Sequence, residues 1–129
     1  MFLIVSNYII GLIGGFILEF SYRSIEQNKL RMPLFADCQI YGLATVLIYL
    51  VYLLSAPVWF VSISLLVITT GLELAFGLYY LKYKNIRLWD YSAYAFNYKG
   101  LICLRFSFYW LVISIVYCYW IIPLLVHLV

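Results

Sequence analysis

The stretch LWDYSAYAFNYKGLICLRFSFYW, residues 88–110, joins a polar part of the chain to its last apolar run. It follows the basic residues of 82–87, passes through aromatic and hydrogen-bonding residues, and enters an apolar run that carries Arg105. A lipid-facing helix would have less polar side chains, and a plain charged loop would have fewer aromatic ones. We therefore expect a polar loop that leads into a membrane-spanning helix near residue 101.

The rest of the chain has the composition of a membrane protein. Of its 129 residues, 67% are hydrophobic and only 10% are charged, and the mean hydropathy is +1.04. A soluble domain carries about 25% charged residues, so that class is excluded. The apolar runs are continuous and show no alternation at period two, which favours helices over a β-barrel. The sequence predicts an all-α integral membrane protein.

Four runs are long enough to cross the hydrocarbon layer of a bilayer. We predict a single domain, residues 1–129, that forms a four-transmembrane-helix bundle with spans at about 2–22, 38–54, 58–81 and 101–128. Pro33 should prevent a continuous helix through the first loop, and Pro123 should kink or end the last helix. In the first span, Gly11 and Gly15 form a small-residue seam that would let another helix approach closely.

The basic residues predict the orientation in the membrane. Apart from Arg105, all lie in the loops 23–37 and 82–100, at Arg23, Lys29, Arg31, Lys82, Lys84, Arg87 and Lys99. The positive-inside rule therefore places both loops in the cytoplasm and both termini outside.

Carboxylates inside or beside the spans are the strongest candidates for a functional site. Glu73 lies eight residues from Leu81, the end of its span, or roughly 12 Å along a helix, and a lone carboxylate at such depth is costly. Glu19 could pair with Arg23 one turn later, and Asp37 fits a helix N-cap. We also expect Glu73 or Glu19 to pair with Arg105.

These groups should meet at the cytoplasmic half of the bundle. One interpretation is a salt bridge that clamps the helices, and the other is a polar pocket open to the cytoplasm and capped by residues 89–97. The candidate pocket residues are Glu19, Asp37, Tyr41, Glu73, Trp89, Asp90, Asn97 and Arg105.

The same motifs resemble a known family of small bacterial membrane proteins, the putative ABC-transporter type IV family. Leu88-Trp-Asp-Tyr-Ser92, Phe96-Asn97, Gly100-x-Ile-Cys-Leu104 and Trp110 are similar to its W-D-Y-S…F-N-x-x-G-x-I-C-L…W signature. Further matches run in the same order, at Gly15-x-x-x-Glu19, Ile40-Tyr-Gly42 and Leu72-Glu73. The chain departs from the usual pattern at 31–37, which has no glycine. The resemblance implies a bacterial cytoplasmic-membrane protein with a role in transport.

Other site chemistries have little support in the sequence. Cys38, Cys103 and Cys118 have no metal-ligand spacing, and His127 is the only histidine, so we expect no metal or other cofactor. No basic run with exposed aromatics indicates nucleic acid. The chain has no G-x-x-x-x-G-K-[ST] motif, so ATP-driven transport would need a separate ATPase.

The leading functional hypothesis is a permease-like transport subunit that works in contact with membrane lipid. Four spans leave little room for a pathway, so we expect a homo-oligomer or a larger complex. The alternative is an accessory or scaffold subunit that binds a membrane enzyme or a lipid-linked substrate. An enzyme with Glu73 or Asp90 as base is disfavoured because no catalytic pair is readable. The one-sided basic bias argues against a dual-topology multidrug antiporter.

Overall fold

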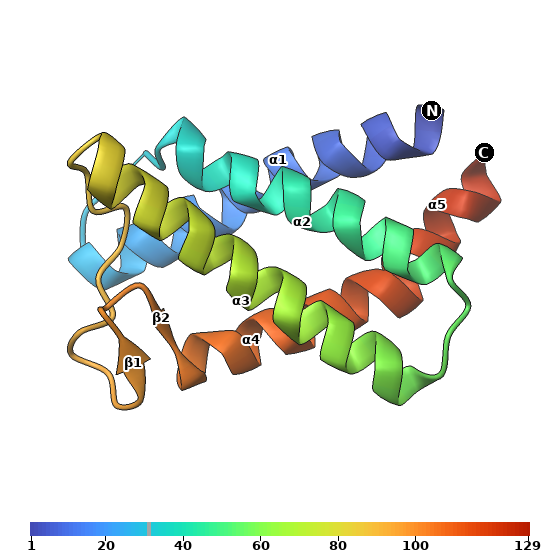
Figure 1. Ribbon diagram of the computed structural model, residues 1–129. Coiled ribbons are helices and arrows are strands. Elements are labelled where there is room, and N and C mark those ends of the chain that lie inside the picture. Colours follow the sequence, from blue (N-terminus) through green and yellow to red (C-terminus); the bar gives the residue numbers. More distant parts are fainter. Residues whose placement is uncertain (31) are drawn as a thin grey trace. The chain divides into compact units, whose positions relative to one another are not determined.

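A computed structural model describes residues 1–30 and 32–129, so Arg31 of the predicted first loop lies outside the described residues. Four helical segments are long and apolar enough to span a membrane in this part of the chain: Phe2–Gln27, Phe35–Leu53, Val58–Tyr83 and Leu104–Leu128. The prediction of an all-α membrane protein with four spans is confirmed. In order, the elements are α1 (Phe2–Gln27), α2 (Phe35–Leu53), α3 (Val58–Tyr83), β1 (Asn97–Tyr98), β2 (Ile102–Cys103), α4 (Leu104–Val116), η1 (Tyr117–Ile121) and α5 (Ile122–Leu128) (Figure 1).

The chain divides into two compact units, residues 1–47 and 48–129, which we describe separately. In the first unit, α1 packs on the first part of α2 through glycine. A methyl group at Gly11 would overlap the Thr45 hydroxyl and lie 2.6 Å from the Tyr41 carbonyl oxygen. A methyl group at Gly15 would lie 2.6 Å from Cβ of Tyr41. The predicted small-residue seam is therefore a close helix contact.

The polar segment between α1 and α2 is shorter than predicted. α1 continues to Gln27 because Arg, Glu and Gln favour helix as well as most apolar residues do. It ends at Asn28, which adopts the left-handed conformation (φ 52°) and donates its backbone N–H to the Ile25 carbonyl. α2 begins at Phe35, so the prediction of Asp37 as its N-cap is wrong: Asp37 lies in the first turn.

In the second unit, α3 and α4 lie side by side and run antiparallel (Figure 1). One buried stripe on α3 recurs every four residues, at Val61, Leu65, Thr69, Glu73 and Gly77. The facing side of α4 buries small residues, and the Thr70 hydroxyl donates to the Ser107 hydroxyl at 3.1 Å. Gly77 lets Leu101 and Trp89 approach the surface of α3 closely. The side chain of Glu73 therefore lies on the side of α3 that the following segment covers.

The polar loop predicted at residues 82–100 is the segment 84–103 in the structure, and it contains a short antiparallel hairpin. Its strands pair Asn97 with Cys103 and Tyr98 with Ile102. Gly100 has φ 68°, a left-handed conformation that other residues rarely adopt. The hairpin uses the residues up to Cys103, so α4 begins at Leu104 instead of residue 101.

Pro123 disrupts the last helix, as predicted, but the disruption lies before the proline. Residues 117–121 form a π-helical turn, in which the Ile122 N–H bonds to the Tyr117 carbonyl five residues back. Proline clashes with the carbonyl of the residue four positions earlier, which is Tyr119 here. The wider turn accommodates this clash without ending the span.

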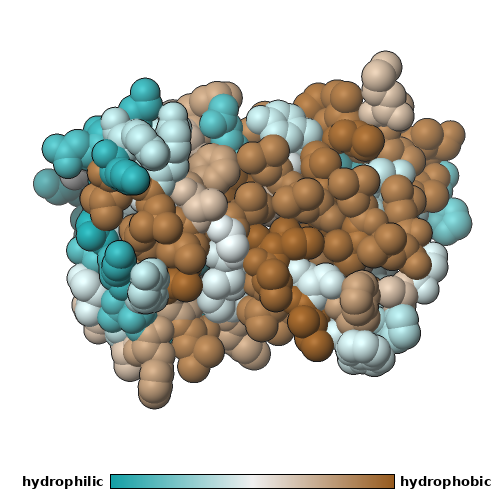
Figure 2. Space-filling view, viewed as in Figure 1, coloured by the Kyte–Doolittle hydropathy of each residue, from teal (hydrophilic) through white to brown (hydrophobic). Residues whose placement is uncertain are grey.

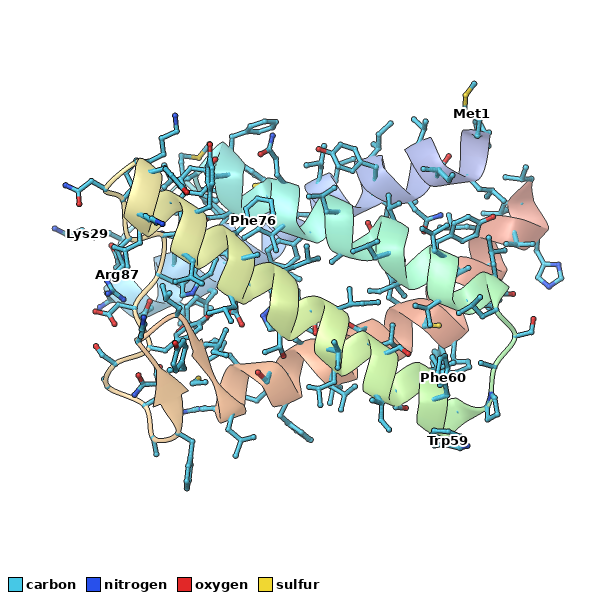
Figure 3. All side chains as sticks on the ribbon, in the orientation of Figure 1. Met1, Lys29, Trp59, Phe60, Phe76 and Arg87 are labelled. Atoms are coloured by element: carbon cyan, nitrogen blue, oxygen red, sulfur yellow. The ribbon has the colours of Figure 1, made fainter. Side chains whose placement is uncertain are left out.

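The surfaces of the helices are apolar, as lipid contact requires. Figure 2 shows hydrophobic residues over most of the visible helical surface, on which strongly hydrophilic residues are few. Trp59 and Phe60 lie at the start of α3, and Arg87 lies beyond its other end (Figure 3). An exposed Trp59 at a helix start suits the aromatic belt of a bilayer interface.

The glycine seam gives a matched test of the α1–α2 contact. We expect Gly11→Ala to lower the free energy of unfolding by about 1–3 kcal/mol, because the added methyl group overlaps α2 backbone atoms. Gly14→Ala is the control, since a methyl group there meets nothing within 4 Å and alanine favours helix. Denaturant unfolding in detergent measures both, and equal stability of the two variants would contradict the packing described.

Candidate functional site

The first unit holds a charge cluster formed by Glu19, Arg23, Asp37 and Tyr41. The Arg23 guanidinium binds two carboxylates: its Nε lies 3.0 Å from Glu19 Oε2 and its Nη2 lies 2.7 Å from Asp37 Oδ2. The Tyr41 hydroxyl donates to Glu19 Oε1 at 2.7 Å. The predicted Glu19–Arg23 pair is therefore confirmed, and two contacts of this cluster, Arg23 with Asp37 and Tyr41 with Glu19, connect α1 to α2.

Asp37 is the most enclosed member of this charge cluster. Its side chain is 2% exposed, whereas those of Arg23 and Glu19 are 21% and 20% exposed. Its bond to Arg23 joins this carboxylate of α2 to α1. Its second oxygen, Oδ1, has no hydrogen-bond partner among the residues that the structure describes.

The second unit holds a buried carboxylate on α3. Glu73 is 2% exposed, and its Oε1 accepts a hydrogen bond of 2.6 Å from the Tyr91 hydroxyl. The Tyr91 ring stacks on Phe106, with 4.4 Å between ring centroids and an angle of 11° between the ring planes. Glu73 is thus shielded from lipid by its own protein, and its partner comes from the segment after the helix.

Three predicted site residues shape this segment. Trp89 donates its indole N–H to the Leu101 carbonyl at 2.7 Å. Asp90 Oδ1 accepts from the Ser92 backbone N–H at 3.0 Å. Asn97 uses both ends of its amide, donating to the Tyr94 carbonyl and accepting from the Gly100 N–H at 2.9 Å. These bonds fold residues 89–101 and thereby position Tyr91.

Arg105 is exposed at the second position of α4. Its Nε donates to the Tyr109 hydroxyl at 2.9 Å, and its guanidinium carbon lies 5.3 Å from the centre of the Tyr94 ring. Because Glu19 pairs with Arg23, Arg105 is not needed as its partner. A pair between Glu73 and Arg105 stays a prediction, as does the meeting of all eight residues in one pocket.

Tyr91 is the functional candidate that the site prediction missed. It belongs to the Trp-Asp-Tyr-Ser motif, and its neighbours Trp89 and Asp90 were both chosen. The sequence did contain a signal for it: Tyr91 follows closely after the span that carries Glu73, and a buried carboxylate needs a hydrogen-bond donor. No group of three His, Cys, Asp or Glu residues that could hold a metal is found within residues 1–30 and 32–129.

The charge cluster predicts that its members depend on one another. We expect Arg23→Met to destabilise the protein by about 3–5 kcal/mol, because it leaves the buried Asp37 carboxylate without its cation. The double variant Arg23→Met, Asp37→Leu should recover much of this loss. Denaturant unfolding in detergent checks both, and a double variant as unstable as the sum of its single variants would contradict the ion pair.

Asp90 gives a prediction for acidic solution. Hydrogen bonds from Ser92, and then the charge of Arg87, hold the pKa of the exposed Asp90 carboxyl below its ordinary value. The pKa of Asp90 is therefore lower in the folded chain than in the unfolded chain, where it is about 4. The ionised carboxylate stabilises the fold above about pH 4, and this stabilisation is lost as the pH falls through the folded pKa. The protection factor of the Ser92 amide, which is the intrinsic exchange rate at each pH divided by the observed rate, should therefore fall below about pH 4. Asp90→Ala removes the acceptor and should lower the protection factor already at neutral pH. A protection factor that stays the same from neutral to acidic pH in the parent chain would contradict this account.

Comparison with known proteins agrees with the motifs. The family model described as "Putative ABC-transporter type IV" matches residues 6–129. No curated protein and no solved structure matches the chain. The matched region includes both carboxylate sites, the Trp-Asp-Tyr-Ser segment and all of α2 to α5. The chain therefore belongs to the putative ABC-transporter type IV family.

Proposed function

We propose that this protein is a permease-like subunit of a transport system, with a polar pocket that faces the cytoplasm. Membership of the family supports a role related to transport. Glu73 is the residue at the centre of the proposed pocket. The loops 23–37 and 82–100 would lie in the cytoplasm, and both termini would lie outside the cell membrane.

The observation that carries this proposal is the burial of Glu73 within a membrane-spanning helix. A carboxylate there is expensive, and such residues usually mark a substrate or ion pathway. The other stripe residues, such as Leu65, Thr69 and Gly77, are apolar or uncharged. A leucine or alanine at position 73 would fill the stripe equally well, so packing alone does not require an acid there. A carboxylate is a strong acceptor, and one that protein shields from lipid and Tyr91 helps to hold in place is suited to bind a cation or a hydrogen-bond donor.

The folded segment 84–103 supports a coupling between this site and a partner. Tyr91 reaches Glu73 from a segment that the indole of Trp89 and the amide of Asn97 hold in shape. Movement of this segment would break or form the bond to Glu73. In the proposed system, a cytoplasmic ATPase acts on this segment, since the chain has no nucleotide-binding motif of its own.

Purification of the tagged chain from its native membrane tests the proposal. We expect an ATPase subunit to co-purify, and ATP hydrolysis by the reconstituted complex to fall by on the order of tenfold or more in Glu73→Gln. That loss corresponds to one hydrogen bond to a charged group. Glu26→Gln is the control, because Glu26 is an exposed carboxylate at the end of α1.

Two outcomes would overturn the transport role. One is full hydrolysis by Glu73→Gln in a complex of unchanged composition. The other is co-purification with a membrane glycosyltransferase or a lipid-processing enzyme and no ATPase, which would support the accessory-subunit alternative. Size-exclusion chromatography and unfolding in detergent confirm that each variant is folded.

A further inference from the structure

Four large apolar side chains are exposed around the start of α4. Phe96 is 83% exposed, and the others are also exposed, at Tyr98, Leu104 and Phe108. We call these four residues the hairpin surface. Phe96 and Tyr98 belong to the hairpin region, whereas Leu104 and Phe108 belong to the membrane-spanning helix.

The hairpin surface is continuous with the lipid-facing side of α4. Leu104, Phe108, Val112 and Val116 are spaced by four, so they share one face of the helix, and all are exposed. The backbone N–H of Leu104 donates to the Phe96 carbonyl at 3.2 Å, which places Phe96 beside the first turn of that face. A surface that lies in hydrocarbon along the helix therefore continues onto the hairpin.

The backbone holds Phe96 in a conformation that a bulky residue rarely adopts. Its φ is 53°, in the left-handed region, where aromatic side chains are crowded. The Asn97 amide, bonded to Tyr94 and Gly100, and the Leu104 N–H keep it there. Because the Phe96 ring is exposed, its burial within this unit does little to offset the cost of the left-handed backbone. Residues held in such conformations cluster at active sites and ligand-binding sites, so the strain at Phe96 points to a role for this position.

The charges beside the hairpin surface fit a phospholipid headgroup. Lys99 is exposed, and its Nζ lies 5.4 Å from the centre of the Tyr98 ring. Arg87 donates to the Lys99 carbonyl at 3.1 Å, but its Nη1 also lies 3.7 Å from Asp90 Oδ1, so Lys99 is the cation that is left to meet a headgroup. Tyrosine and lysine are typical of the boundary between acyl chains and headgroups, where lysine attracts anionic lipids.

We propose that residues 96–99 insert into the membrane interface, with Phe96 among the acyl chains and Lys99 at an anionic phospholipid headgroup. The hairpin then anchors the 84–103 segment to the bilayer. This inference concerns the hairpin surface alone and does not rest on the proposed transport role.

Spin-label accessibility tests the insertion directly. The full chain, with its three native cysteines replaced by alanine, carries a label at Phe96→Cys and is reconstituted in vesicles of phosphatidylethanolamine and phosphatidylglycerol. Phe108→Cys provides the lipid reference, and Lys84→Cys provides the aqueous reference. We expect the Phe96 label to collide with oxygen much more than with a water-soluble nickel chelate, as the Phe108 label does.

Two results would overturn the proposal. The first is a label at position 96 that collides with the nickel chelate as strongly as the label at position 84 does, because such a label lies in water. The second is an immobile label that neither reagent reaches, because such a label is covered by protein, for example by a second copy of the chain. Tyr98→Cys repeats the measurement at a neighbouring exposed position, so that local disruption of the strained backbone at 96 does not decide the outcome.

Discussion

Hydrocarbon cannot solvate a carboxylate, and this constraint explains the arrangement around Glu73. The residue lies within a span, and it is buried against its own protein on a stripe that includes small residues such as Thr69 and Gly77. Its hydrogen bond comes from Tyr91, which lies outside the helices. The segment between α3 and α4 must therefore fold back onto the helix, and its hairpin, indole bond and side-chain amide bonds make that fold possible.

The same constraint acts differently in the first unit. There, Glu19 and Asp37 share one guanidinium, and Tyr41 supplies a further donor to Glu19. The glycines of α1 permit the close approach of α2 that brings these groups within hydrogen-bonding distance. Close helix packing and polar pairing thus stabilise the same contact, and the loss of either should weaken the other.

The spans were predictable because hydropathy depends only on composition over a window of about 19 residues. The ends of the spans were not predictable from hydropathy. The run from Arg23 to Gln27 is polar, but its residues favour helix, so α1 continues beyond the apolar stretch. The role of Asp37 was mistaken because capping is a local rule, whereas Arg23 is fourteen residues away and competes for the same carboxylate. The two-residue strands of the hairpin are too short to show alternation in sequence.

The pair of Glu73 and Tyr91 is the central claim, and a double-mutant cycle tests it most directly. The free energies of unfolding of Glu73→Leu, Tyr91→Phe and the double variant are compared with that of the parent chain in detergent, because each single variant then removes one partner of the bond. A hydrogen bond to a buried charge predicts a coupling energy of about 1.5–3 kcal/mol between the two sites. Additive effects, with a coupling energy near zero, would show that the 84–103 segment does not bind the carboxylate within the membrane.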